Sequence, residues 1–294
     1  MIRKMSLVWL VLALWFAGIA NVVADEVRYR PFTLASTSPG SVSDKLAGVR
    51  ASLQQNGFEI AGEYAPYPGA HILIVTNAEM RKSAAGSDHG GFGAAARVAL
   101  TESNGQVQVS YTSPGWMTNV YRMNGDGEAV ARKLAAALGS AKGFGSEGGR
   151  KVANLREYHY MMFMPYFDDQ VTLAEYAGYK EALAAVNKAL STGQGGSSKV
   201  YQIDIPGKEE TLIGVALKQG EGADATVMAT TDQGELKHTA HLPYEILVSG
   251  SKVYMLHGKF RIAQSFPDLT MGTFMKISGA PDAIEASLRA AAGN

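Results

Sequence analysis

Three histidines in the last third of the chain have a spacing that could bind a metal. His238 and His241 are three residues apart, and His257 follows the next turn, at Ser249-Gly250. If the strands flanking that turn pair in simple register, His257 lies opposite the residue next to His241, and two or three imidazoles converge. Imidazole is a common ligand of transition metals, so the pattern predicts a copper or zinc site. Separate histidines with ordinary hydrogen bonds are the alternative. Two carboxylates nearby could complete such a site: Glu235 and Glu245.

A second group that could bind a metal lies in the aromatic and methionine-rich segment 158–167. His159 offers an imidazole, and Met161 and Met164 offer thioether sulfurs, which suit Cu(I). Methionine also fills irregular gaps in apolar cores, so the segment could instead pack in a core or between domains. If the segment is exposed, it could be the surface through which a scaffold or accessory protein docks onto an exported or membrane-bound complex.

Two arginines occupy similar places in the two halves of the chain and could bind an anion. Arg122 stands in a Tyr-Arg-Met sequence and Arg261 in a Phe-Arg-Ile sequence. A guanidinium can hold a carboxylate or phosphate through two parallel hydrogen bonds. The pair therefore predicts a small anionic ligand at the seam between the halves, with pairing to neighbouring carboxylates as the alternative.

No motif in the sequence fixes a reaction, so we expect a non-catalytic protein. The run at 143–148 matches the glycine pattern of dinucleotide-binding loops, but it follows a helix where that loop requires a strand, and we interpret it as a linker. The chain has no cysteine, which excludes disulfides, thiol catalysis and cysteine-ligated zinc. Lys+Arg and Asp+Glu are both 27, and this balance argues against a nucleic-acid partner.

The elements that must position these residues follow the same order twice. The helical stripe Leu46-Val49-Leu53 recurs with identical spacing as Leu183-Val186-Leu190. In each half an extended pair, a hairpin and a closing helix follow. The extended pairs lie at 58–64 with 71–76, and at 200–205 with 211–217. Hairpins pair strands antiparallel, so the fold class is α+β: two similar domains, each an antiparallel sheet with helices on one face.

Local signals predict where some of these elements begin. Ser43 is a plausible N-cap of the first helix, and Thr172 with Glu175 forms a capping box ahead of its counterpart. In the last hairpin, Tyr254, Leu256, Phe260 and Ile262 predict a strand after the turn at Ser249-Gly250.

Several short stretches of the first half match a known family pattern. They are Gly-Phe-Glu-Ile at 57–60, Ile-Leu-Ile-Val-Thr-Asn at 72–77, Arg-Val-Ala-Leu at 97–100, Val-Gln-Val-Ser-Tyr at 107–111 with Pro114, and Tyr-Arg-Met at 121–123. Over roughly residues 42–140 the chain resembles the domain-of-unknown-function family numbered 302. The second half resembles it through the repeat alone. The resemblance implies a compact α+β domain with helices against an antiparallel sheet, and it implies no activity and no site residues.

The N-terminus has the features of a secretory signal. Arg3 and Lys4 precede an apolar run at 7–20, and Val22 and Ala24 are small residues at the positions a signal peptidase reads. We therefore expect cleavage after Ala24, a periplasmic location and no transmembrane segment in the mature chain.

The predicted organisation has a signal peptide at 1–24, an extension at 25–41, and α+β domains at 42–140 and 172–294. A linker with the aromatic and methionine-rich segment separates the domains at 141–171. Clefts between domains are common ligand sites. We therefore expect a protein that binds a metal ion or a small anion at the domain seam.

Overall fold

The computed structural model describes residues 27–293, and the predicted signal peptide lies outside them. Two short strands form a pair of their own, β1 (Arg28–Tyr29) and β8 (Arg150–Lys151). The other described strands join one 11-stranded sheet in which all neighbours are antiparallel. The predicted α+β class with antiparallel strands is confirmed.

The first half of the chain supplies six strands of that sheet. Its elements are β2 (Phe32–Pro39), α1 (Val42–Gln55), β3 (Glu59–Tyr64), β4 (Ala70–Thr76), α2 (Ala78–Ala85), the 3-10 turn η1 (Gly90–Gly93), β5 (Ala96–Ser103), β6 (Gln106–Thr112), α3 (Pro114–Val120), α4 (Glu128–Leu138) and β7 (Lys142–Phe144). The short helix α5 (Val152–Arg156) leads into the second half.

The second half supplies the remaining strands. Its elements are β9 (Val171–Glu175), α6 (Tyr179–Ser191), η2 (Gln194–Gly196), β10 (Ser197–Asp204), β11 (Glu210–Leu217), α7 (Asp224–Thr231), η3 (Thr239–His241), β12 (Tyr244–Ser249), β13 (Lys252–Met255), α8 (Gly258–Ala263), α9 (Met271–Lys276) and α10 (Ala280–Ala291).

The strand order follows the same path in both halves. Outward from the centre of the sheet, the order is β3-β4-β5-β6-β2 on one side and β10-β11-β12-β13-β9 on the other, and β7 adds a further strand beyond β2. The sheets that the sequence assigned to separate domains are thus joined edge to edge through β3 and β10. The duplication of an ancestral domain stays a prediction.

A close backbone approach joins the two central strands. Gly62 of β3 pairs with Tyr201 of β10, and each follows a register shift in its own strand. A Cβ atom on Gly62 would lie 2.4 Å from the carbonyl oxygen of Val200, so a larger residue would push the strands apart. This glycine therefore helps to hold the two halves in one sheet.

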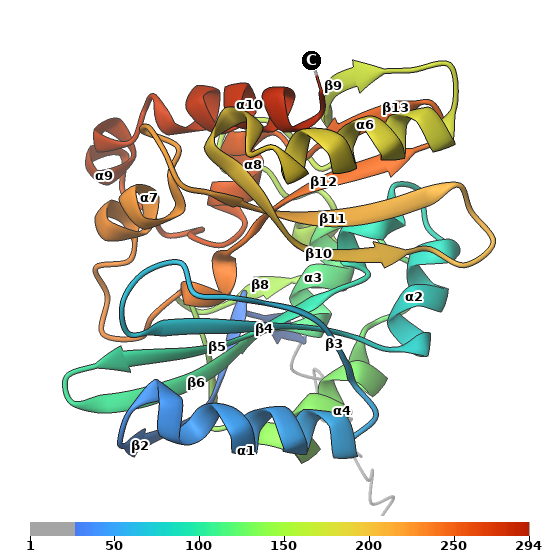
Figure 1. The fold of residues 1–294 in the computed structure, drawn as a ribbon. Helices are drawn as coiled ribbons and strands as arrows, with labels where there is room; N and C mark the ends of the chain where they lie inside the picture. The colour runs from blue at the N-terminus through green and yellow to red at the C-terminus, as the bar shows by residue number, and fades with distance from the viewer. Residues whose placement is uncertain (1–26, 294) are drawn as a thin grey trace, which may run out of the picture.

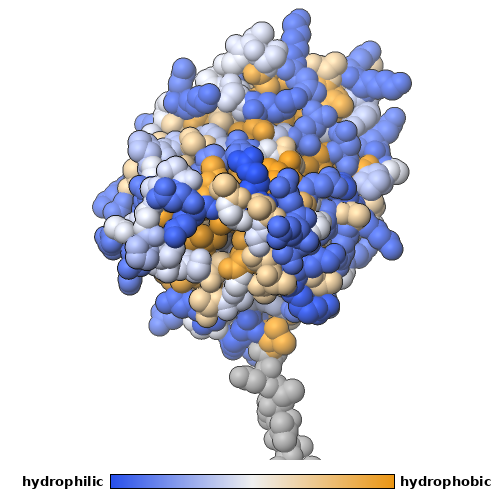
Figure 2. Space-filling model, turned by 60° about the horizontal axis from the view of Figure 1, so that its bottom comes forward, coloured by the Kyte–Doolittle hydropathy of each residue, from blue (hydrophilic) through white to orange (hydrophobic). Residues whose placement is uncertain are grey.

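Helices cover the outer sides of the sheet in both halves (Figure 1). α1 and α4 pack against the first half, where Leu53 and Leu134 meet Leu73 and Val98 in one core. α6 and α10 lie over the second half, and Phe260 of α8 contacts Tyr121, the residue that follows α3. The face drawn in Figure 2 is mostly hydrophilic, with apolar residues in smaller areas between. Among residues 27–293, no helix combines the length and apolar character that crossing a bilayer requires.

Two predicted helix starts were wrong. The cap of α1 is Ser41, not Ser43: its hydroxyl accepts from the Asp44 amide, and the Asp44 carboxylate accepts from the Ser41 amide. The predicted capping box at Thr172 and Glu175 lies in β9, which pairs with β13, and α6 begins at Tyr179. Strand pairing, which no local signal reports, overrides the local capping pattern there.

The last hairpin also differs from its predicted register. Ser249 pairs with Lys252 and Leu247 with Tyr254, so the turn is Gly250-Ser251, and the assumed pairing is wrong by two residues. The strand ends at Met255 because α8 begins at Gly258, and Phe260 and Ile262 are helical and buried.

Each half places a 3-10 turn against the sheet of the other half. In η1, the Gly91 amide donates to Oε1 of Glu210 on β11, at 2.9 Å. In η3, the Thr239 hydroxyl lies 2.8 Å from the Thr101 hydroxyl on β5 and 2.9 Å from the Tyr67 hydroxyl. The seam between the halves is therefore interlocked as well as hydrogen-bonded along β3 and β10.

The predicted linker is largely part of the packed structure. β7 pairs with β2, so Lys142–Phe144 belongs to the sheet. The segment 158–167 forms no strand, and its two ends, Tyr158 and Phe167, are buried.

Candidate functional site

A buried ion-pair cluster lies at the seam. Arg97 of β5 and Glu245 of β12 hold corresponding places, since Arg97 pairs with Ile74 and Glu245 with Gly214 on the corresponding strands β4 and β11. Nη2 of Arg97 contacts Oε1 of Glu245, and Nε of Arg261 lies 3.3 Å from Oε2. Two buried guanidiniums thus share one carboxylate. Burial, with the charge of Arg261, lowers the pKa of Arg97 to about 10.

The structure places His241 in this cluster. Arg261 Nη1 lies 2.9 Å from Nδ1 of His241, and because a guanidinium only donates, Nδ1 accepts. Nε2 then carries the hydrogen and donates to the Tyr244 hydroxyl at 3.1 Å. Burial, reinforced by the charges of Arg261 and Arg97, holds the pKa of His241 well below its usual value. His241 is therefore a neutral imidazole with both nitrogens hydrogen-bonded.

A surface cleft of about 580 Å³ opens beside this cluster, and we call it the seam cleft. The first half contributes Arg30 and residues 142–148, and the second half contributes residues from Thr230 to His238 and from Phe266 to Thr273. The seam cleft is the feature closest to the ligand site that the sequence predicts between the halves.

His238 forms an aromatic wall of the seam cleft. Its ring stacks on Phe266 at 4.8 Å and meets Phe32 and Phe144 edge-on. Nδ1 donates to the Asp232 carboxylate at 3.2 Å, and the His238 amide donates to the same carboxylate at 3.0 Å. In the neutral ring this leaves the lone pair on Nε2, and the protonated ring can donate from Nε2 to a ligand.

A glycine lets His238 Nε2 reach the seam cleft. A Cβ atom on Gly145 would lie 3.0 Å from Nε2, and Gly145 has a φ of +92°, which favours glycine. Arg30 Nε donates to the Ser146 carbonyl at 3.0 Å and fixes this loop. The run interpreted as a linker therefore forms one wall of a cleft.

The walls of the seam cleft carry two cations that have no carboxylate partner among residues 27–293. Arg30 and Lys142 form no ion pair with any residue of the described part of the chain. The buried Ser146 hydroxyl lacks a hydrogen-bond partner among the same residues. Two acidic residues also line the cleft: Asp268, which accepts from the Glu147 amide and faces Arg150 at 3.8 Å, and Glu147 itself. The two cations and the Ser146 hydroxyl suit an anionic group.

The other predicted metal ligands lie elsewhere. His257 caps α8, with Nδ1 accepting from the Lys259 amide at 3.2 Å, and burial and the charge of Lys259 lower its pKa. It lines a shallow pocket with Met164 rather than with His238. His159 packs on Tyr166 at 4.4 Å, and Met161 is exposed. His238 and His241 do come together, since both rings contact the ring of Phe266.

The two arginines that the sequence predicts to bind an anion, Arg122 and Arg261, have different surroundings in the structure. Arg261 is buried in the ion-pair cluster. Arg122, just after α3, pairs with Asp168 at 2.8 Å and donates from Nε to the Arg156 carbonyl. Neither lines the seam cleft. Both arginines instead pair with neighbouring carboxylates, which is the alternative that the sequence left open.

Within residues 27–293 there is no group of three or more His, Asp or Glu side chains arranged to hold a metal ion. Comparison of the chain with family models, with curated proteins and with solved structures finds no match. The resemblance to the domain-of-unknown-function family therefore stays a prediction.

Sequence reasoning missed most of the seam cleft. Arg30 and Asp232 belong to no motif in the sequence. Asp232 contacts His238, and Arg30 and Ser146 line the same cleft as His238, because β2, β7 and the segment after α7 come together at the seam. The signals available were the dense glycines at 143–149 and the acidic residue six positions before His238.

Proposed function

We propose that the protein is an exported, non-catalytic binding protein that holds a small anionic ligand in the seam cleft. The observation that carries the proposal is the imidazole of His238, oriented by Asp232 and reaching the cleft past Gly145. It lies beside the cations of Arg30 and Lys142, which have no ion-pair partner among the described residues. Hydrophobic walls from Phe266 and Phe144 would exclude water from one side of the ligand.

Titration calorimetry with citrate and inorganic phosphate as probes, and glycerol as the neutral control, tests the proposal. We expect at least one anion to bind and glycerol not to bind. Arg30→Gln or Lys142→Gln should weaken anion binding about tenfold each, since each removes a charged donor. The matched variant Lys180→Gln, on α6, should bind as the wild type does. Equal binding by all four proteins, or binding by none, would overturn the proposal.

Export is tested separately. Mass spectrometry of the protein from a periplasmic fraction should find Asp25 as the first residue, in agreement with the small residues Val22 and Ala24. A protein that keeps residues 1–24, or that fractionates with the cytoplasm, would contradict export and leave the cleft proposal to its own test.

A second candidate function, docking onto an exported protein or membrane complex, has an observation of its own. Phe163 is 97% exposed and Met162 is 74% exposed, although the ends of the same segment are buried. Large apolar side chains so fully exposed are typical of interaction surfaces. A photo-crosslinking residue at position 163 should give one discrete product in cells, and the same residue at Glu181 should not. Identical patterns at both positions would contradict docking here.

A further inference from the structure

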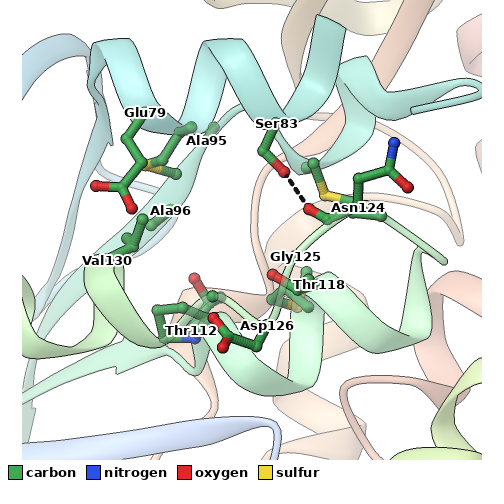
Figure 3. A pocket seen from close by; sticks show the side chains of 16 residues that line it. Glu79, Ser83, Ala95, Ala96, Thr112, Thr118, Asn124, Gly125, Asp126 and Val130 are labelled. Atoms are coloured by element: carbon green, nitrogen blue, oxygen red, sulfur yellow. Dashed lines mark hydrogen bonds between the residues drawn. The ribbon is translucent and has the colours of Figure 1, made fainter. Parts of the chain in front are cut away.

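A second, smaller pocket lies in the first half, away from the seam cleft. It has a volume of about 130 Å³ and is enclosed by α2, α3, α4 and the loop at 123–127 (Figure 3). It shares no lining residue with the seam cleft. Nothing in the proposed function uses it.

Three methionines line this pocket, which we call the methionine pocket. Met80 comes from α2, Met117 from α3 and Met123 from the loop that follows, and all three are buried. Ala95, Ala96 and Val130 complete the apolar lining. Methionine side chains are flexible and polarizable, so such a lining adapts to apolar groups of different shape. The interior of the pocket therefore suits an apolar body.

The charged residues that line the methionine pocket are both acidic. Glu79 lies on the α2 side, and Asp126 lies on the loop before α4 (Figure 3). Lys133 approaches Glu79 at 3.3 Å, but this pair is well exposed and so is weak in water. The α4 N-terminus offers little to an anion, because Oδ1 of Asp126 already accepts from the Glu128 amide at 2.9 Å. A positive charge is therefore favoured at this rim.

The loop that carries Asp126 is held in place without a ligand. The Ser83 hydroxyl donates to the backbone carbonyl of Asn124 at 2.8 Å, which is drawn as a dashed line in Figure 3. The backbone amide of Asn124 donates to the Ser87 hydroxyl at 2.9 Å. Gly127 has a φ of +76°, and a Cβ there would lie 2.8 Å from the Pro114 carbonyl. The pocket is therefore preformed, which lowers the entropic cost of binding.

We propose that the methionine pocket binds a small organic cation: a primary amine whose apolar body is one ring or a short alkyl chain. The volume sets the size, since a cavity of about 150 Å³ in another protein accommodates benzene. The methionines contact the apolar body, and Glu79 and Asp126 attract the ammonium group at the rim. This site is independent of anion binding in the seam cleft.

Methyl-labelled methionine NMR tests the proposal directly, with three probes of one shape and different charge: benzylamine, benzyl alcohol and benzoate. We expect benzylamine to shift the methyl signals of Met80, Met117 and Met123 at concentrations about tenfold below those needed with benzyl alcohol. Benzoate should be the weakest. The exposed Met162 and Met275 serve as internal controls that stay unshifted.

Variants separate charge from shape. Glu79→Gln with Asp126→Asn should weaken benzylamine binding about tenfold and leave benzyl alcohol unchanged, whereas Glu181→Gln on α6 should change neither. Val130→Phe should fill the pocket and abolish both, and an otherwise unchanged methyl spectrum shows that this variant folds. If Val130→Phe does not fold, the charge variants alone decide. Equal affinity for benzoate and benzylamine, or no shift of the three methyl signals, would overturn the proposal.

Discussion

At the scale of single residues, Asp224 connects the two halves through a buried carboxyl group. Oδ2 accepts from the Tyr64 hydroxyl of β3 and from the Leu217 amide, and Oδ1 has no partner among the described residues. Burial raises its pKa from 3.8 to about 7, although both hydrogen bonds act in the opposite direction. The folded protein therefore holds this proton more tightly than the unfolded chain does.

The stability of the protein should fall as the pH rises through the pKa of Asp224. The contribution is complete below about pH 4, where both states are protonated, and is lost as the pH passes about 7. Between pH 5 and pH 8 the group removes about 2–3 kcal/mol from the free energy of unfolding. Urea unfolding at pH 5 and pH 8 measures this loss. The free energy of unfolding of Asp224→Asn should fall by about 2–3 kcal/mol less than that of the wild type over this interval. Asp88→Asn, at an exposed position, should behave as the wild type, and parallel behaviour of all three would refute the assignment.

Because Arg97 and Arg261 share the carboxylate of Glu245, removing Glu245 should destabilise the protein more than removing one arginine. Glu245→Gln leaves two buried guanidiniums without a counter-charge, which costs about 3–5 kcal/mol. Arg97→Met leaves Arg261 and Glu245 as a balanced pair and should cost less than about 1 kcal/mol. Urea unfolding at pH 7 measures both. Equal losses would mean that the charge balance of the cluster is not what stabilises the seam.

At the scale of elements, the packing of η1 against β11 of the other half can be tested by substituting a glycine in η1. A Cβ on Gly91 would lie 2.4 Å from Cδ1 of Leu247 and 2.9 Å from Oε1 of Glu210, so Gly91→Ala should destabilise the protein by about 1–3 kcal/mol. Gly48 lies in α1 with open space around it, and Gly48→Ala should stabilise by about 0.5–1 kcal/mol. Thermal unfolding of both variants gives the comparison; a neutral Gly91→Ala would contradict the tight docking of η1.

Elements with a strong local period could be predicted, and those set by distant contacts could not. The stripe Leu46-Val49-Leu53 lies in α1, and the apolar run at 72–75 lies in β4, because burial of one face selects each pattern. Phe260 and Ile262 were assigned to a strand, because short apolar runs fit either period and only packing of α8 between the halves decides. For the same reason, the sequence predicts His241 as a metal ligand and Arg261 as an anion ligand, and does not reveal that the two side chains contact each other.

At the scale of the whole molecule, one continuous sheet and the crossed 3-10 turns join the two halves that the sequence predicts as domains. No signal in either half reveals that β3 and β10 pair, because the contact joins residues far apart in sequence. The sequence predicts the seam only as a place where two similar units meet. It does not predict the seam cleft, because the cleft is lined by side chains from both halves.

Because the two halves share one sheet, we expect the protein to unfold as a single cooperative unit. Native-state hydrogen exchange should give β5 and β12 amides the same free energy of opening, because breaking either half exposes the apolar core that spans both. Gly62→Val forces a side chain against the Val200 carbonyl and should lower both values together by about 1–3 kcal/mol. Gly48→Ala should raise both slightly. If β12 amides keep their protection while β5 amides lose it in Gly62→Val, the halves are separate cooperative units, and the seam is an interface between domains that fold alone.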